Sequence, residues 1–280
     1  LVDIGLELPP TDMLGFDAAD VAARWPVPGP NDDKYTQGVT GILAGSSTYP
    51  GAAVLCTGAA VAATSGMVRY AGSAAQQVLS HWPEVIAAPS ASASGRVQAW
   101  AVGPGLGTDH TGAAAVWFAL STDLPVIVDA DALTILAAHP DLVTNRAAPT
   151  VLTPHAGEFA RLAGSPPGDD RVAATRRLAD HLGATVLLKG NVTVVAEPGG
   201  PVYLNPAGQS WAATAGSGDV LSGMIGALLA ADLPAGEAAA AAVFVHARAA
   251  NLSAADPGPR PAPTSASRIL AHIRTALGSL

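Results

Sequence analysis

The sequence predicts an α/β fold built on a mostly parallel central sheet with helices on both faces. From Gly38 onward, short apolar runs rich in β-branched residues alternate with longer alanine-rich stretches that suit helices. Hydrophobic side chains make up 49% of the 280 residues, which is enough for a sizeable core. Charged residues are only 13%, while 30 glycines and 23 prolines supply tight turns. Strands and helices alternating in this way are typical of parallel sheets that are covered on both faces.

The predicted strands are the short apolar runs. They are residues 39–44, 67–70, 84–87, 97–102, 125–129, 150–153, 184–189, 192–196 and 202–204. Helices are predicted at residues 51–65, 112–121, 131–138, 156–163, 169–182, 219–231, 235–252 and 264–277, several of them started by a Gly, Asp or Pro signal. The last two strands are separated by a Pro- and Gly-rich turn, so we expect them to form a β-hairpin.

The first 33 residues differ from the rest of the chain. They contain three Pro-rich or Asn/Asp-rich stretches and little periodicity that is typical of a core. We therefore expect residues 1–33 to be a lead-in with few core contacts and residues 34–280 to form one domain. Because the chain begins with Leu1 and not with Met, we expect a processed chain or a piece of a longer one.

Composition excludes several classes of function. Fourteen basic against twenty-two acidic residues give a net charge of −8, which disfavours nucleic acid as a partner. No apolar run approaches the roughly 18 residues that span a bilayer, so we expect no membrane insertion. The single cysteine, Cys56, forms no internal disulfide and no thiolate metal cluster, which fits a reducing, cytoplasmic location.

Two glycine-rich segments follow predicted strands, at the place where open α/β sheets bind ligands. Residues 44–53 combine small side chains with the start of a helix, and residues 103–107 carry three glycines. Small residues let a ligand approach the backbone closely. Each segment alone is equally well explained as a turn.

Two further segments place acids or an imidazole at strand ends. Asp129 and Asp131 follow residues 125–128, where a carboxylate either faces a metal–phosphate group or caps the next helix. We favour the cap for Asp131 and leave Asp129 open. His155 and Glu158 lie three residues apart at a predicted helix start. They either contact a ligand or are structural groups, with Glu158 complementing the helix dipole.

Residues 212–223 form the most informative segment. Gly216, Ser217 and Gly218 lead into a helix that carries Asp219 at its start. Free backbone N–H groups at such a helix start form an anion site for a transferring phosphoryl group. Asp219 then lies where a general base takes a proton from an attacking hydroxyl, although an N-cap explains it equally well.

Lysine is scarce in this chain. Only Lys34 and Lys189 occur, and Lys189 heads the segment 189–193 at a turn between two predicted strands. A cation followed by amide and hydroxyl groups suits a nucleotide's phosphates and sugar. A lysine at a strand end is otherwise usually a solvated tip.

In this order, the segments resemble the ADP-dependent NAD(P)H-hydrate dehydratases of the ribokinase-like superfamily. The resemblance extends over about residues 34–278 and rests on residues 44–53, 103–107, 128–133, 153–158, 189–193 and 215–223. Residues 1–10 are similar to the exit from the epimerase domain that precedes this module in many bacterial relatives. The resemblance therefore implies that residues 1–33 are the linker and exit of an epimerase domain, and that residues 34–280 are the dehydratase domain of a bifunctional repair enzyme.

The resemblance implies a ribokinase-like fold and a repair reaction. The family removes water from the hydrated forms of NADH and NADPH, called NADHX and NADPHX, and converts ADP to AMP and phosphate. The (6S) hydrate is phosphorylated on its C6 hydroxyl and then loses phosphate, which is a better leaving group than water. ADP and Mg²⁺ are the implied phosphoryl donor and ion.

The resemblance also assigns residues. Asp219 matches the catalytic aspartate, and Gly216, Ser217 and Gly218 match the anion hole, with Ser217 where many relatives have Thr. The positions that match hydrate contacts are Ala52, Gly105, His155 and Asp219, and those that match nucleotide contacts are Lys189, Gly190, Asn191, Val192, Thr193 and Gly218. Glu158 matches a glutamate that organises Mg²⁺ through water. Residues 34–38 are a loose form of another family segment, which leaves their role open.

Two other functions were weighed against this one. A kinase of a small alcohol, such as a hydroxymethylpyrimidine or hydroxyethylthiazole, uses the same glycine–aspartate corner, but residues 49–53 and 153–158 favour the dehydratase. A non-catalytic nucleotide sensor would lack Asp219, Lys189 or the glycines, and all are present. We also expect self-association through apolar alanine faces.

Overall fold

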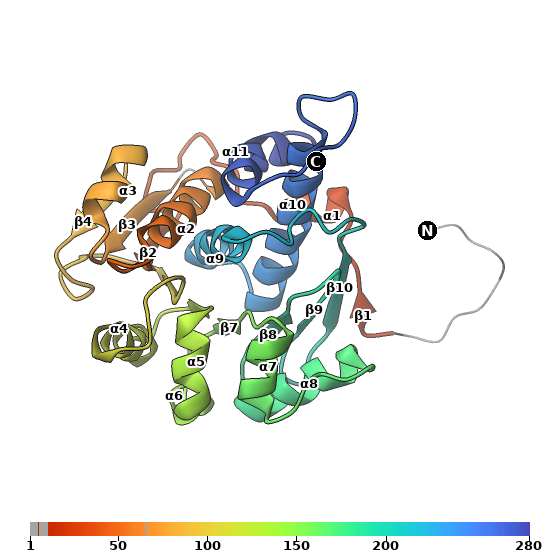
Figure 1. The fold of residues 1–280 in the computed structure, drawn as a ribbon, viewed down its shortest axis with the longest axis horizontal. Helices are drawn as coiled ribbons and strands as arrows, with labels where there is room; N and C mark the ends of the chain where they lie inside the picture. Colours follow the sequence, from red (N-terminus) through yellow and green to blue (C-terminus); the bar gives the residue numbers. More distant parts are fainter. Residues whose placement is uncertain (1–4, 6–10, 65) are drawn as a thin grey trace.

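The computed structural model describes residue 5, residues 11–64 and residues 66–280, so the predicted domain exit at residues 1–10 lies outside the described residues except for Gly5. The strands form one sheet in the order β1-β10-β9-β8-β7-β6-β5-β2-β3-β4 (Figure 1). They are β1 (Met13–Leu14), β2 (Val39–Leu43), β3 (Met67–Ala71), β4 (Ile86–Ala88), β5 (Ala99–Val102), β6 (Val126–Val128), β7 (Thr150–Leu152), β8 (Thr185–Leu188), β9 (Val192–Ala196) and β10 (Val202–Pro206).

The sheet is mostly parallel, as predicted. From β8 across to β4, each neighbouring pair of strands is parallel. Strand β9 is antiparallel to both β8 and β10, which confirms the predicted hairpin and adds a second tight reversal between β8 and β9. That reversal contains Gly190 and Asn191, because two antiparallel strands need only a short connection.

Helices cover both faces of the sheet. They are α1 (Ala18–Arg24), α2 (Pro50–Ala63), α3 (Ala75–His81), α4 (His110–Ser121), α5 (Asp131–Ala138), α6 (Asp141–Thr144), α7 (Ala156–Ala163), α8 (Arg171–Leu182), α9 (Ser217–Ala230), α10 (Ala235–Ala255) and α11 (Ala266–Leu277). Figure 1 shows α2, α9, α10 and α11 on one side of the sheet and α4 to α8 on the other.

Two buried hydrophobic clusters correspond to these two layers. Strand side chains alternate between faces, so Ile127 belongs to the cluster under α2, α9, α10 and α11, whereas Val126 and Val128 belong to the cluster under α4, α5, α7 and α8. Strand β6 is thus buried on both sides, which explains why its sequence is a continuous apolar run. The central sheet therefore holds the strand ends in fixed relative positions.

The lead-in contributes more to the core than expected. Strand β1 pairs with β10, and Val21 of α1 and the following Trp25 are buried, with 0% and 6% of their surfaces exposed. The Trp25 indole donates to the carbonyl of Ala63 at 2.8 Å, and Arg24 lies 3.0 Å from Glu237 of α10. The expectation of few core contacts before residue 34 is therefore wrong, because the seven-residue helix α1 lies between the Pro-rich stretches and buries Val21.

Four elements were not predicted, namely β1, α1, α3 and α6. Each is short, and α3 and α6 have no side-chain cap that marks their start. The alanines of α10 are largely buried within the same molecule, between α9, α11 and the sheet, so they do not supply the predicted self-association face. Within the described part of the chain, no helix is long and apolar enough to cross a membrane.

Candidate active site

The predicted ligand segments follow neighbouring strands at one edge of the sheet. Asp129 directly follows β6, His155 follows β7 after two residues, and Lys189 directly follows β8. The loops after β2 and β5 lie beside them and are joined by a 2.7 Å hydrogen bond from Gly45 N to the Pro104 carbonyl. The strand order reverses between β2 and β5, which is where open α/β sheets form ligand crevices.

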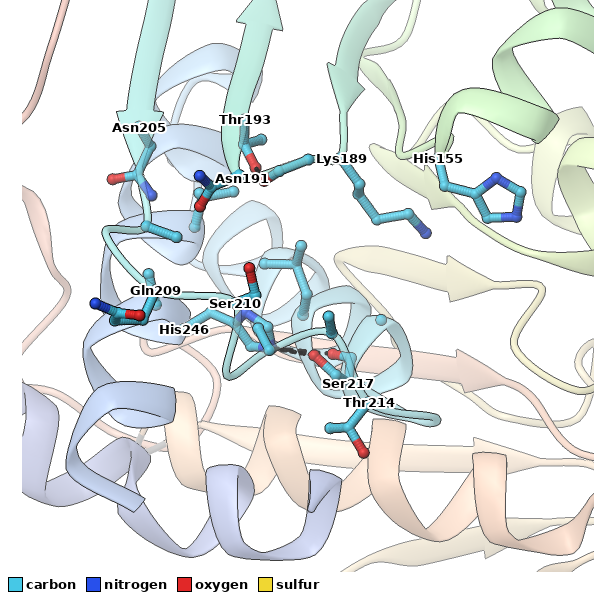
Figure 2. Close-up of a pocket in the computed structure, with 18 residues that line it drawn as sticks. His155, Lys189, Asn191, Thr193, Asn205, Gln209, Ser210, Thr214, Ser217 and His246 are labelled. Carbon is cyan, nitrogen blue, oxygen red and sulfur yellow. Dashed lines mark hydrogen bonds between the residues drawn. The ribbon is translucent and has the colours of Figure 1, made fainter. Parts of the chain in front are cut away.

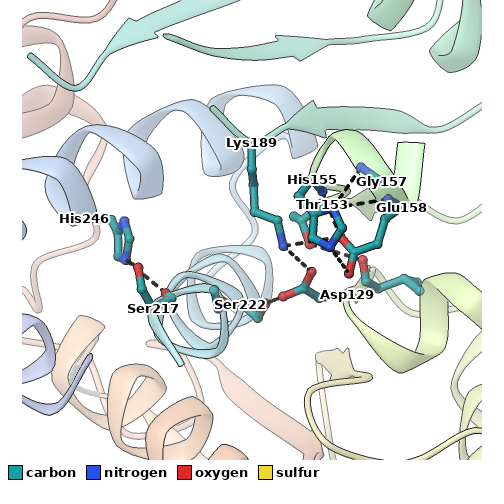
Figure 3. Close-up of polar contacts among 11 residues, drawn as sticks. Asp129, Thr153, His155, Gly157, Glu158, Lys189, Ser217, Ser222 and His246 are labelled. Atoms are coloured by element: carbon teal, nitrogen blue, oxygen red, sulfur yellow. Dashed lines mark hydrogen bonds and ion pairs between the residues drawn. The ribbon is translucent and has the colours of Figure 1, made fainter. Parts of the chain in front are cut away.

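A mostly buried ion pair joins the ends of β6 and β8 (Figure 3). Lys189 Nζ lies 2.8 Å from Asp129 Oδ1 and 3.7 Å from Glu158 Oε2, and the Ser222 hydroxyl donates to Asp129 Oδ2 at 2.7 Å. Burial alone lowers the pKa of Lys189, but the carboxylates of Asp129 and Glu158 outweigh it, so this pKa is raised. Lys189 is therefore a fixed cation and not a solvated tip, and Asp129, left open by the sequence, is its partner.

His155 and Glu158 form a capping box at the start of α7. His155 Nδ1 accepts from the N–H groups of Gly157 and Glu158, and Glu158 Oε2 accepts from His155 N at 2.8 Å. Because Nδ1 accepts these bonds, the imidazole hydrogen is on Nε2. The His155 side chain is 57% exposed, but its Nε2 lies 3.4 Å from Glu158 Oε1, so this N–H faces Glu158 while Nδ1 caps the helix. The structural interpretation of His155 is thus supported, while its contact with a ligand stays a prediction.

Asp219 lies in the first turn of α9 without a hydrogen-bond partner among the described residues. Gly216, with φ +82°, is the N-cap, and no side chain caps this helix, so the alternative of an N-cap Asp219 is excluded. Burial and then the Asp129 carboxylate raise the pKa of Asp219 to about 7, while Lys189 opposes the shift. A carboxylate with a pKa near neutrality is suited to accept a proton from a substrate hydroxyl.

The glycine loop after β5 brings together two predicted hydrate contacts. A side chain at Gly105, where φ is +63°, would come within 2.7 Å of Ala52 Cβ, so the loop packs directly against the start of α2. Gly107 N donates to Asp131 Oδ2 at 2.8 Å. The N-cap of α5 is Ala130, so the prediction of Asp131 as an N-cap is wrong. Its carboxylate holds the neighbouring loop instead, a contact between residues 24 positions apart.

A cavity of about 470 Å³ opens beside the start of α9 (Figure 2). Its lining includes most of the residues that were predicted to bind the nucleotide, together with His155 at one end. These predicted nucleotide contacts are Lys189, Gly190, Asn191, Thr193 and Gly218, and Ser217 of the predicted anion hole lines the cavity as well. Val192 does not line it, because alternation along β9 turns this side chain away from Thr193, and 43% of Val192 is exposed.

The remaining predicted residues do not line this cavity. They are Ala52, Gly105, Glu158, Gly216 and Asp219. Asp219 interacts electrostatically with Lys189 on the cavity side and with Asp131, which holds the glycine loop. Asp219 is therefore close enough to both Lys189 and Asp131 for their charges to affect its pKa.

The sequence prediction missed several polar residues of the cavity, among them Asn205, Gln209, Ser210 and His246. Asn205 Nδ2 is buried and has no hydrogen-bond partner among the described residues. His246 contacts Ser217 from α10, 29 positions away. The available signal for His246 was an imidazole within an otherwise apolar, alanine-rich helix.

The site contains carboxylates but no preformed metal cage. Among the residues that the structure describes, no group of three or more His, Cys, Asp or Glu side chains is arranged to hold a metal ion. Both Asp129 oxygens are already bonded, to Lys189 and Ser222, and Glu158 Oε2 accepts from His155 N. The residues present therefore fit a divalent ion whose coordination comes mainly from ligand oxygens and water.

Comparisons with known proteins agree with this geometry. The chain is 81% identical over its whole length to the bifunctional NAD(P)H-hydrate repair enzyme of Mycobacterium leprae and spans 59% of that protein. It is 40% identical to the ADP-dependent (S)-NAD(P)H-hydrate dehydratase of Neisseria meningitidis, over 78% of each chain. The ADP/ATP-dependent NAD(P)H-hydrate dehydratase of Bacillus subtilis, co-crystallised with ATP/Mg²⁺, is 30% identical and superimposes with a TM-score of 0.81, covering 94% of this chain and 98% of that one.

The likeness to the Bacillus subtilis structure confirms the ribokinase-like fold that the sequence resemblance implied. A family model described as NAD(P)H-hydrate dehydratase matches residues 40–272, which is most of the chain and includes the predicted catalytic and nucleotide-binding residues. The chain therefore belongs to the NAD(P)H-hydrate dehydratase family.

Proposed function

We propose that this chain removes water from (6S)-NADHX and (6S)-NADPHX at the expense of ADP, giving AMP and phosphate. One observation carries the proposal: the unpartnered carboxylate of Asp219, with a pKa of about 7, lies directly beside the N–H groups that open α9. Family membership and the printed activity of the Neisseria meningitidis relative support the same reaction.

The first step transfers the β-phosphoryl group of ADP to the C6 hydroxyl of the hydrate. Asp219 takes the hydroxyl proton as the oxygen attacks phosphorus, and the bond to the bridging oxygen of ADP breaks to release AMP. The backbone N–H groups of Gly216 and Gly218 face the charge that develops on the phosphoryl oxygens, whereas the Ser217 N–H donates to the Thr214 carbonyl oxygen at 3.2 Å. In the second step the C6–O bond breaks, C5 loses a proton, and phosphate leaves as the double bond is restored.

The nucleotide is proposed to occupy the cavity beside α9. Lys189 supplies a fixed positive charge, and Gly190 to Thr193 supply the wall at the start of the hairpin, where Val192 has only its backbone to offer. Arg171 fixes this segment, because its Nη2 donates to the Lys189 carbonyl at 3.1 Å. When bound, Mg²⁺ would neutralise the phosphates, held mainly by their oxygens and by water at Glu158.

The hydrate is proposed to bind on the other side of Asp219. Ala52 and Gly105 form its small-residue wall, and the exposed imidazole of His155 lies at the carboxyl ends of the strands of the same sheet. This arrangement would place the C6 hydroxyl between the Asp219 carboxylate and the anion hole. Residues 34–280 are the proposed dehydratase domain, and residues 1–33 are proposed to be the linker and exit of an epimerase domain. We also propose that the protein self-associates and lies in the cytoplasm.

The test is to incubate the protein with a mixture of both hydrate epimers, Mg²⁺ and either ADP or ATP. Recovery of reduced-nicotinamide absorbance should require nucleotide, be faster with ADP, and consume the S epimer, with the R epimer disappearing only as fast as it does without enzyme. The Asp219→Asn variant is the control for enzyme-dependent turnover. Phosphorylation of hydroxymethylpyrimidine or hydroxyethylthiazole without hydrate repair would instead identify a small-alcohol kinase.

A further inference from the structure

His246 of α10 contacts the first residue of α9 inside the nucleotide cavity (Figure 2). Its Nε2 lies 3.1 Å from Ser217 Oγ and 3.0 Å from the Ser217 carbonyl oxygen. Both side chains are buried, with 7% of His246 and 3% of Ser217 exposed. The sequence did not indicate this contact, because Ser217 and His246 lie on two different helices, α9 and α10.

The carbonyl determines where the imidazole hydrogen lies. A carbonyl oxygen only accepts hydrogen bonds, so His246 Nε2 carries the hydrogen and donates it. Burial lowers the pKa of His246 to about 4, so the ring is neutral at physiological pH and Nδ1 carries no hydrogen. Ser217 Oγ, facing the same N–H, is therefore an acceptor in this contact.

The acceptor role of Ser217 Oγ directs its own hydrogen elsewhere. Among the described residues, the hydroxyl has no other hydrogen-bond partner. Ser217 also lies between Gly216 and Gly218, whose N–H groups open the helix, and it lines the cavity. An anion in the cavity is the acceptor that this O–H lacks.

We propose that His246 is a positioning residue that fixes the Ser217 hydroxyl as a hydrogen-bond donor to the phosphoryl group in the anion hole. The inference rests on the proposed function, because the phosphoryl group is that of bound ADP. His246 acts through Ser217 and takes no proton in the reaction. The hydroxyl then adds a directed side-chain donor to the backbone N–H groups.

A purely structural role explains the contact less well. The inner face of α10 is otherwise apolar around this position, with Ala242, Val243, Val245 and Ala249 buried. An imidazole buried there costs more desolvation than an aliphatic side chain of similar size. Ser217 is the first residue of α9, so its carbonyl oxygen already has an intrahelical N–H four residues ahead and does not require the histidine.

A double-mutant cycle tests the proposal. His246→Leu removes the donor with little change in volume, Ser217→Ala removes the hydroxyl, and the double variant carries both. ADP affinity is measured by calorimetry, and turnover of (6S)-NADHX gives kcat and KM. We expect Ser217→Ala to lower kcat about a hundredfold and His246→Leu about tenfold, with KM for the hydrate unchanged. The double variant should be no slower than Ser217→Ala alone, because His246 acts only through that hydroxyl.

Two conservative variants serve as controls. His246→Gln keeps an N–H donor near the Nε2 position and should retain kcat within threefold, as should Ser217→Thr, which keeps the hydroxyl. If His246→Leu fails to fold, His246→Asn replaces it in the cycle, because the shorter amide does not reach Ser217. A thermal unfolding curve for each variant establishes that it is folded.

Additive losses in the cycle would overturn the proposal, because they would mean that His246 does not act through the Ser217 hydroxyl. Unchanged ADP affinity and unchanged kcat in both single variants would also overturn the proposal. Failure of the proposed function can be told apart from failure of this inference. If the wild-type protein binds ADP but does not repair the hydrate, the cycle is measured on ADP affinity alone. Non-additive losses of ADP affinity would then support the positioning role on binding alone.

Discussion

Replacing Asp219 by asparagine should make the protein more stable and nearly inactive at the same time. The Asp219 carboxylate has no hydrogen-bond partner among the described residues and lies near the carboxylates of Asp129 and Asp131. Its pKa is raised from 3.8 to about 7, burial being the largest cause. The ionised form is therefore less favourable in the folded chain than in the unfolded one.

The sign and size of the expected stability change follow from proton linkage. A carboxyl whose folded-state pKa is raised binds more protons when folded, so it reduces stability as pH rises from its unfolded pKa to its folded pKa. Each pKa unit corresponds to about 1.4 kcal/mol, so a shift from 3.8 to about 7 sets an upper limit of about 4 kcal/mol. Partial solvent access reduces this, and we expect the asparagine variant to gain on the order of 2 kcal/mol at pH 8.

The assay is urea unfolding of wild type and Asp219→Asn between pH 4 and 9, with turnover measured in parallel. The stability gain should be near zero at pH 4, grow toward pH 7 and level off above it. Turnover of the hydrate should fall about a hundredfold or more, the range of a general base. Asp17→Asn is the matched control, because Asp17 caps α1 far from the site and asparagine caps equally well.

Two results would refute the reasoning. A stability difference that does not change with pH would mean that Asp219 is not held in an unfavourable ionised state. Turnover within threefold of wild type at any pH would remove it as the base. Wild-type kcat/KM should itself fall as pH drops below about 7, because the base is then protonated.

Three other outcomes are expected. Lys189→Ala and Gly218→Val should weaken the binding of ADP or AMP more than that of the hydrate, as measured by calorimetry, because one removes the fixed cation and the other fills the anion hole. Nucleotide affinity equal to that of wild type in both variants would mean that the nucleotide binds elsewhere. Excess EDTA should abolish turnover and added Mg²⁺ restore it, since the phosphates need neutralisation, and full activity in EDTA would contradict this. Trp25→Ala should lower the free energy of unfolding by about 3 kcal/mol, because it leaves a cavity and unpairs the Ala63 carbonyl. A loss below about 1 kcal/mol would mean that the segment before residue 34 is dispensable, as the sequence suggested.

The sequence predicted the central sheet well because each strand is a buried apolar run bounded by turn residues. Val126 to Val128 pack on both faces, so period-2 alternation is absent but the run is unmistakable. Helix α1 was missed because its signals are local and weak. Its capping box has Asp20 at the third position, where Glu or Gln is usual, and a single residue, Val21, is buried within it.

The candidate site could be proposed from the sequence only where its residues lie in contiguous motifs. The glycines before Asp219 and the segment from Lys189 to Thr193 are each readable in one stretch of chain. The contacts that tune them are not, because Ser222 reaches Asp129 across 93 positions and His246 reaches Ser217 across 29. Packing of the helices onto the sheet creates these contacts, and periodicity does not encode which polar groups meet.

The charges that meet at this edge of the sheet explain why ADP needs more than a lysine to bind. Lys189 is already partnered by Asp129 and lies near Glu158, so its positive charge is partly offset before a ligand binds. Bound phosphates would add negative charge next to the Asp219 carboxylate, which must lose its proton to act as a base. We expect backbone N–H groups at the start of α9 to offset part of that charge, and a divalent ion carried by the phosphates to offset the rest. The carboxylates that add to burial in raising the pKa of Asp219 are therefore the reason why we expect the reaction to depend on the anion hole.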